Sequence, residues 1–201
     1  MTSTQNILQA NLHGSLGVQD ALYNDPGIWD FDAILIQEPH YWEIAGNLHV
    51  TGAGPNFEVI KPKTLQRENQ TQRIRSCMWI NSNTKYTQLT INSNDITAVI
   101  LQHGTRSILV ASLFIPSIGH GNEADEQELH SRLQEVQEAI TRERNNNLEF
   151  EVFIAGDFNG HDTVWGGNEM ALETRQGEGS RILDLIEENN LQLLTQRGVP
   201  T

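Results

Sequence analysis

The chain has 201 residues, 37% of them hydrophobic and 19% charged, which is the composition of a globular domain and excludes a disordered segment. The formal net charge of −13 argues against a general nucleic-acid binder with a basic surface, although it suits a site that collects cations. The single cysteine, Cys77, excludes an intramolecular disulfide bond, and no signal peptide or transmembrane segment is recognisable, so we expect an intracellular protein without a membrane partner.

The first part of the chain predicts a strand, a helix and a second strand. Residues 5–12 form a short strand pattern, and residues 15–25 have a weak helical pattern that ends in an Asp-Pro-Gly turn. Residues 31–40, "FDAILIQEPH", are apolar at consecutive positions in their centre, which is typical of a strand covered on both faces. Pro39 then ends the strand because proline cannot donate a ladder hydrogen bond.

The middle of the chain is rich in predicted strands separated by Asn, Ser, Gly and Asp turns. The candidates are residues 56–62, 75–82, 85–92, 96–104 and 106–117. A polar segment, residues 63–73, predicts an exposed loop. Arg67, Arg73 and Arg75 in or beside it are candidates for DNA contacts, but a solvated surface loop accounts for them better.

The last part alternates helices and strands. Apolar residues at helical spacing, Leu129, Leu133, Val136 and Ile140, predict an amphipathic helix over about 124–144. A strand over 149–157, a loop through residue 175, a helix over 180–190 and the start of a strand at 191–195 follow. This order predicts an α/β fold with two packed sheets and helices outside. A single doubly wound sheet is the alternative, weakened by the absence of a Gly-x-Gly-x-x-Gly turn after any strand.

Three apolar strands end in polar residues that strand propensity does not explain. These residues are Asn11 and His13 after the first, Gln37 and Glu38 after the second, and Asp157, Asn159 and His161 after the third. Carboxylates and amides together suit Mg²⁺, which prefers oxygen ligands and needs only one or two protein carboxylates. Asp157 could then hold or deprotonate a water, while Asn159 and Asn11 could donate hydrogen bonds to the water or to phosphate oxygens.

Each of these strand ends taken alone is more simply a turn. Asp, Asn and Gly are common where strands end, and a single "GDFN" is more often a turn than a site. The occurrence of three such ends in order, each after an apolar strand, favours a site.

Five pieces of the chain resemble the endonuclease/exonuclease/phosphatase superfamily, and most closely the endonuclease domain of non-LTR retrotransposons, the fungal kind especially. They are "ILQANL", "FDAILIQEPH", "SLFIPS", "IAGDFNGHDTVWGG" and "EGSRILDLIEENNLQLLTQRGVPT". The most specific is "GDFNGHDTVWG", because simple phosphatases of the superfamily do not usually have its His and Trp-Gly. The resemblance implies a four-layer α/β sandwich, two packed mixed sheets flanked by helices.

The resemblance also implies roles for individual residues. Glu38 resembles the ligand of Mg²⁺ or Mn²⁺, and Asn11 resembles the amide beside metal and phosphate. Asp157 and Asn159 resemble the pair that positions the attacking water and the scissile phosphate. His161 and Trp165 match the retrotransposon branch and are expected to act in catalysis and substrate binding. For Trp165, a core position that supports the loop is an open alternative.

Two departures from the family pattern are visible. Phe114 stands where many members have a tyrosine whose hydroxyl contacts the phosphate. Phenylalanine has no hydroxyl, so at this substrate-binding position the hydrogen bond to the phosphate is missing. The family also has a Ser-Asp-His motif that the 201 residues do not contain. We therefore expect one domain over residues 1–201, incomplete at its C-terminus and lacking its last strands.

The resulting expectation is a Mg²⁺-dependent DNA endonuclease domain that nicks its target by metal-assisted attack of water. DNA is the expected partner, a reverse transcriptase domain of the same polyprotein is a further candidate partner, and the resemblance implies the nucleus. Two alternatives stay open. One is a catalytically inactive remnant or a metal- or phosphate-binding module, and the other is a small-molecule phosphatase of the same fold.

Overall fold

The structure, a computed structural model, describes residues 4–52, 54–63, 73–104, 106–116, 123–146, 150–160, 162–166 and 179–198. The chain forms two compact units. The first comprises residues 1–114 and 146–157, and the second comprises residues 115–145 and 158–201. No helix in the described ranges has both the length and the apolar character needed to cross a membrane.

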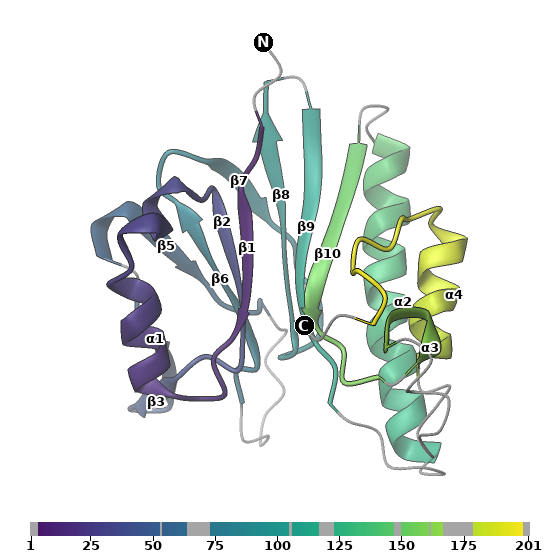
Figure 1. Cartoon of the computed structure of the whole chain (residues 1–201), viewed down its shortest axis with the longest axis horizontal. Coiled ribbons are helices and arrows are strands. Elements are labelled where there is room, and N and C mark those ends of the chain that lie inside the picture. The colour runs from purple at the N-terminus through teal and green to yellow at the C-terminus, as the bar shows by residue number, and fades with distance from the viewer. Residues whose placement is uncertain are drawn as a thin grey trace. The chain divides into compact units, whose positions relative to one another are not determined.

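The first sheet of the first unit is mixed (Figure 1). Its strands lie in the order β1 (Ile7–Asn11), β2 (Ala33–Gln37), β6 (Ser76–Asn81) and β5 (Phe57–Ile60). β1 and β2 pair in parallel because the chain crosses over between them through α1 (Leu16–Tyr23) and the 3₁₀ turn η1 (Pro26–Asp30). The β2–β6 and β5–β6 pairs are antiparallel.

The second sheet repeats this pattern. Its strands lie in the order β10 (Phe150–Asp157), β9 (Arg106–Phe114), β8 (Ile96–His103) and β7 (Lys85–Gln88). β10 and β9 are parallel, whereas the β8–β9 and β7–β8 pairs are antiparallel. Each sheet therefore has one parallel pair at an edge, and in both pairs the strands end in register, Asn11 beside Gln37 and Asp157 beside Phe114.

The two sheets pack face to face, and the first sheet is also covered on its other face. Leu35 and Met78 of the first sheet share a buried cluster with Val110 of the second. Ile34 and Ile36 point the other way, into a cluster with Ile28 of η1. This arrangement explains the consecutive apolar residues of β2, all of which are fully buried.

Cys77 belongs to this core. Its side chain is fully buried, and burial raises the pKa of its thiol far above the ordinary value. The thiol is therefore a small buried hydrophobe and not a nucleophile.

A two-stranded hairpin, β3 (Tyr41–Ile44) and β4 (Asn47–Val50), follows β2 and was not predicted. Buried Gln19 of α1 fixes both of its ends, accepting from the His40 backbone N–H at 2.8 Å and donating to the Thr51 carbonyl at 3.1 Å. A short 3₁₀ turn, η2 (Gly54–Asn56), leads from the hairpin to β5.

The second unit has helices and no strand among its described residues. It contains α2 (Glu123–Asn146), the single turn α3 (Thr163–Gly166) and α4 (Ser180–Glu188). α2 and α4 lie side by side, and Arg144 Nη2 donates to the Asn189 carbonyl at 2.8 Å (Figure 1). The predicted helix over 124–144 is confirmed, and its four apolar residues are buried.

The strand predicted at 191–195 is wrong. These residues have no strand assignment, the Leu191 N–H bonds back to the Ile186 carbonyl, and Leu194 is 72% exposed. An apolar pattern forms a strand only when a neighbouring strand is present to satisfy its backbone groups, and none pairs with this segment among the described residues.

The prediction of an α/β fold with two packed mixed sheets and helices is confirmed. The doubly wound alternative is wrong because the strands form separate sheets.

Candidate active site

The parallel pairs of the two sheets end side by side in the first unit. Asn11 closes β1 and Asp157 closes β10, and the Asn11 Nδ2 donates to Asp157 Oδ2 at 2.7 Å. The Asn11 Oδ1 accepts from the His13 backbone N–H at 2.9 Å, so both ends of the amide are engaged and its orientation is fixed. The structure thus brings together two residues that the sequence predicted for one site.

Glu38 lies at the same end of the first sheet, directly after β2. Its backbone N–H donates to the Arg75 carbonyl at 2.8 Å, and its carbonyl accepts from Gly14 at 2.8 Å. The side chain is 35% exposed and its Oε2 lies 3.5 Å from Nδ1 of His13. The carboxylate is therefore held by its backbone while its oxygens stay accessible.

Three residues of the predicted strand ends adopt left-handed backbone conformations. The φ angles are 50° for His13, 47° for Glu38 and 45° for Asn159. Asparagine tolerates this region, but glutamate and histidine enter it at a cost that the surrounding bonds must offset. Such conformations cluster at functional sites, which supports a function for these ends.

Buried hydrogen bonds of Gln37, the residue before Glu38, connect the two sheets. Gln37 is fully buried, accepts from Gln9 Nε2 at 2.6 Å and donates to Ser112 Oγ of the second sheet at 2.8 Å. Ser76 Oγ also donates to the Ser112 carbonyl at 2.8 Å. Because buried polar groups need hydrogen-bond partners, these bonds fix how the two sheets are placed against each other next to Glu38.

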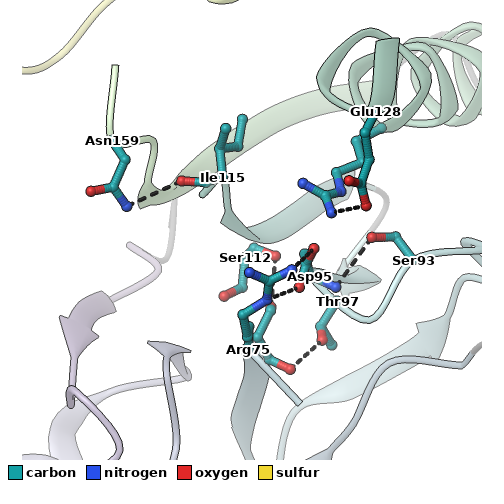
Figure 2. Close-up of polar contacts among 10 residues, drawn as sticks. Arg75, Ser93, Asp95, Thr97, Ser112, Ile115, Glu128 and Asn159 are labelled. Atoms are coloured by element: carbon teal, nitrogen blue, oxygen red, sulfur yellow. Dashed lines mark hydrogen bonds and ion pairs between the residues drawn. The ribbon is translucent and has the colours of Figure 1, made fainter. Parts of the chain in front are cut away.

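Arg75 contacts Asp95 (Figure 2) and Phe114 in an arrangement that the sequence did not predict. Arg75 donates from Nε and Nη2 to the two carboxylate oxygens of Asp95, at 2.6 and 2.9 Å. Its guanidinium carbon lies 5.1 Å from the centre of the Phe114 ring. Phe114 is only 7% exposed, and its N–H donates to the Asp95 carbonyl at 2.8 Å.

The interpretation of Arg75 as part of a solvated loop is therefore wrong, because it is paired with a buried carboxylate. Arg73 is exposed, and Arg67 lies outside the described residues. A signal was present in the sequence, since Arg75 and Asp95 each directly precede an apolar strand.

Asn159 and Trp165 belong to the second unit, and each has a contact there. Asn159 Nδ2 donates to the Ile115 carbonyl at 3.1 Å (Figure 2). The half-buried Trp165 donates from Nε1 to the Gly160 carbonyl at 2.9 Å. A Cβ atom on Gly179 would lie 2.2 Å from the Trp165 ring, so the ring is packed against that backbone. His161 lies outside the described residues.

These contacts of Trp165 are those of a residue that supports the loop between Gly160 and α3. The same loop is closed by Asp162, whose carboxylate accepts from the Val164 N–H at 2.9 Å. Substrate binding by Trp165 and by Phe114 stays a prediction.

The donor set of the first unit fits a weakly held Mg²⁺ or Mn²⁺. Glu38 and Asp157 offer carboxylate oxygens, Asn11 offers an amide oxygen, and Mg²⁺ in proteins keeps several waters beside one or two carboxylates. Within the described ranges no group of three or more His, Cys, Asp and Glu side chains could hold a metal ion.

Comparisons with known proteins agree with the fold. A protein-family model described as "Endonuclease-reverse transcriptase" matches residues 108–201. No curated protein sequence matches the chain.

Solved structures share the fold at low sequence identity. The endonuclease domain of TRAS1, a telomere-specific non-LTR retrotransposon, is 18% identical, with a TM-score of 0.67 over 98% of this chain and 76% of that domain. Sphingomyelinase C from Streptomyces griseocarneus is 14% identical, with a TM-score of 0.58 over 96% of this chain and 72% of the enzyme. A beta toxin from Staphylococcus aureus is 10% identical, with a TM-score of 0.59 over 94% and 73%.

Proposed function

The chain has an endonuclease/exonuclease/phosphatase-type fold, similar to that of a retrotransposon endonuclease domain, and on this basis we propose that it is a divalent-metal-dependent DNA endonuclease domain of retrotransposon type. The observation that carries the proposal is the Asn11–Asp157 hydrogen bond, which joins the ends of two strands from different sheets beside Glu38. DNA is the proposed substrate, a reverse transcriptase domain of the same polyprotein is the proposed partner, and the nucleus is the proposed location.

In this proposal each residue has a separate task. Asp157 accepts a proton from the attacking water, and Asn11 holds the Asp157 carboxylate in place through its Nδ2–H. Asn159 and His161 contact the water or the phosphate. Glu38 and the Asn11 amide oxygen would hold a Mg²⁺ ion, which when bound supplies positive charge to neutralise the phosphate.

The contacts of Asn11 suit it to more than one task. One Nδ2–H donates to Asp157 and Oδ1 accepts from the His13 N–H, and a side-chain amide has a second N–H and a second oxygen lone pair. Asn11 can therefore position Asp157 and also contact a cation or a phosphate oxygen.

We expect Mg²⁺-dependent nicking of supercoiled plasmid. Because the 201 residues contain no Ser-Asp-His motif, the assay compares the chain with a joined protein, in which residue 201 is followed by the Ser-Asp-His segment of a retrotransposon endonuclease domain. The joined protein should nick faster, since residues that act as one catalytic unit lose most activity together. EDTA should stop the reaction.

The same assay separates the alternatives. If neither protein nicks DNA but a chromogenic phosphodiester is hydrolysed, the chain is a phosphodiesterase for small substrates, an alternative that the sphingomyelinase-like fold favours. If neither substrate reacts, the chain is an inactive binding module.

Glu38→Ala should weaken Mn²⁺ binding at least about tenfold, because even residues outside the coordination shell of metal sites often contribute that much. Titration of Mn²⁺ followed by its electron paramagnetic resonance signal measures this. Glu43→Ala removes an exposed glutamate of β3 and is the matched control, which should leave binding unchanged. Equal affinities in the wild type and Glu38→Ala would remove Glu38 from the metal site.

A further inference from the structure

Arg75 lies between the two halves of the proposed site. Its backbone carbonyl accepts from the N–H of Glu38 at 2.8 Å, which places it beside the first sheet's strand end. Its guanidinium lies over the ring of Phe114, 5.1 Å from the ring centre, and Phe114 is the register partner of Asp157 in the second sheet. Arg75 thus contacts Glu38 through its backbone and the register partner of Asp157 through its side chain.

Asp95 holds this guanidinium in one orientation. The carboxylate is 2% exposed and receives Nε and Nη2 of Arg75 at 2.6 and 2.9 Å (Figure 2). The Asp95 N–H in turn donates to Ser93 Oγ at 3.1 Å. A guanidinium that is bound at one edge and stacked on a ring loses little further conformational entropy when its other edge binds a ligand.

The outer edge of the guanidinium remains available. Arginine has five N–H donors, and the two bonds to Asp95 leave the Nη1 donors, for which no described residue is an acceptor. The side chain is 27% exposed. Because a buried ion pair generally adds little net stability over apolar residues, stability alone does not account for placing this pair beside Glu38.

The positive charge of the Arg75 guanidinium suits a site that binds a phosphodiester. Glu38 and Asp157 are carboxylates and would repel the phosphodiester anion, whereas the guanidinium attracts it. The Phe114 side chain has no hydrogen-bond donor, whereas the Arg75 guanidinium stacked on it has charged donors that suit phosphate oxygens.

We propose that the outer edge of Arg75, oriented by Asp95 and Phe114, binds a non-bridging oxygen of the substrate phosphodiester. Arg75 then provides the donor that the Phe114 side chain lacks. The assignment of a substrate rests on the proposed function, but binding of a phosphodiester at Arg75 can be measured without any cleavage.

The probe is the dinucleotide TpT, which has a single phosphodiester, added to ¹⁵N-labelled protein in the presence of Mg²⁺. We expect a saturable shift of the Arg75 Nε–H resonance and binding at least about tenfold weaker for the methylphosphonate analogue of TpT, which has an uncharged linkage. An unmoved Arg75 resonance, or equal affinity for both dinucleotides, overturns the proposal.

The variants separate binding from folding. Arg75→Gln alone would remove one partner of the buried Asp95 carboxylate and change its charge balance, so the double variant Arg75→Gln/Asp95→Asn, which removes both charges of the pair, is the test. It should keep the wild-type circular dichroism spectrum and bind TpT about tenfold more weakly. Arg106→Gln breaks an exposed pair with Glu151 and should bind TpT as the wild type does. Unchanged affinity in the folded double variant contradicts the proposal.

These results are independent of the proposed function. If TpT binds through Arg75 but the joined protein does not nick plasmid, the endonuclease proposal fails and the phosphate site stands. If plasmid is nicked and Arg75 does not respond to TpT, only the role of Arg75 fails.

Discussion

Asp157→Asn should lower the nicking rate of the joined protein by about 10³-fold while leaving the fold intact. The asparagine is nearly the same size, and its Oδ1 can still accept the hydrogen bond that Asn11 donates at 2.7 Å. What it loses is the negative charge that, in the proposed function, accepts a proton from water and attracts a cation. Rates from plasmid nicking and melting temperatures from circular dichroism measure the two effects separately.

Glu151→Gln is the matched control for this charge loss. Glu151 belongs to the same strand, β10, but its side chain is 56% exposed and, among the described residues, pairs with exposed Arg106 at 3.6 Å. The control should nick at the wild-type rate. A fall of less than tenfold in Asp157→Asn would show that Asp157 does not perform the proton transfer.

Gly156→Ala should lower the free energy of unfolding by about 3 kcal/mol or more. A Cβ atom at this position would lie 1.9 Å from the Leu113 carbonyl oxygen and within 3 Å of two more backbone atoms of Leu113. Neither strand can relieve such a contact by rotating a side chain, so β10 must separate from β9. Because Asp157 is the next residue, activity should fall as well. Urea denaturation measures the loss of stability.

Gly17→Ala provides the comparison. Gly17 lies in α1, and the nearest atom to its Cβ would be Ser15 Oγ at 4.0 Å, which is ordinary contact. This variant should be as stable as the wild type or up to about 1 kcal/mol more stable, because alanine favours a helix over glycine. If both variants unfold at the wild-type urea concentration, the close approach of β9 and β10 is not as the structure shows.

The sequence predicted most of the strands because burial on both faces leaves a strong pattern. Ile34, Leu35 and Ile36 are consecutive apolar residues, and each is fully buried between two apolar layers. The amphipathic spacing of α2 is similarly informative. The ends of these elements were harder to interpret, since an acid or amide there serves equally well in a turn.

The hairpin of β3 and β4 was missed for a physical reason. Its turn residues Ala45 and Gly46 have φ angles of 51° and 79°, a pair of left-handed residues in which the first is normally asparagine, aspartate or glycine. Alanine at that position removes the usual sequence signal. Residues 191–195 show the opposite error, because an apolar pattern suggested a strand for which no partner is present among the described residues.

The sequence proposed residues for the candidate site, but not the contacts between them. Asn11, Glu38 and Asp157 were expected together, and the structure joins Asn11 to Asp157 directly. The pairing of Arg75 with Asp95 depends on the folding of segments 20 residues apart in sequence, and residue spacing alone does not reveal it.

The hydrogen bond between Asn11 and Asp157 also determines when the site can exist during translation. The two residues are separated by 146 positions in the chain. At roughly 5–20 residues per second, a ribosome takes on the order of 7–30 s to travel from one codon to the other. A nascent chain therefore has Glu38 and Asn11 long before it has Asp157, the proposed general base. A messenger cut or a ribosome stalled before the codon of Asp157 gives a product unable to form the Asn11–Asp157 bond of the proposed site.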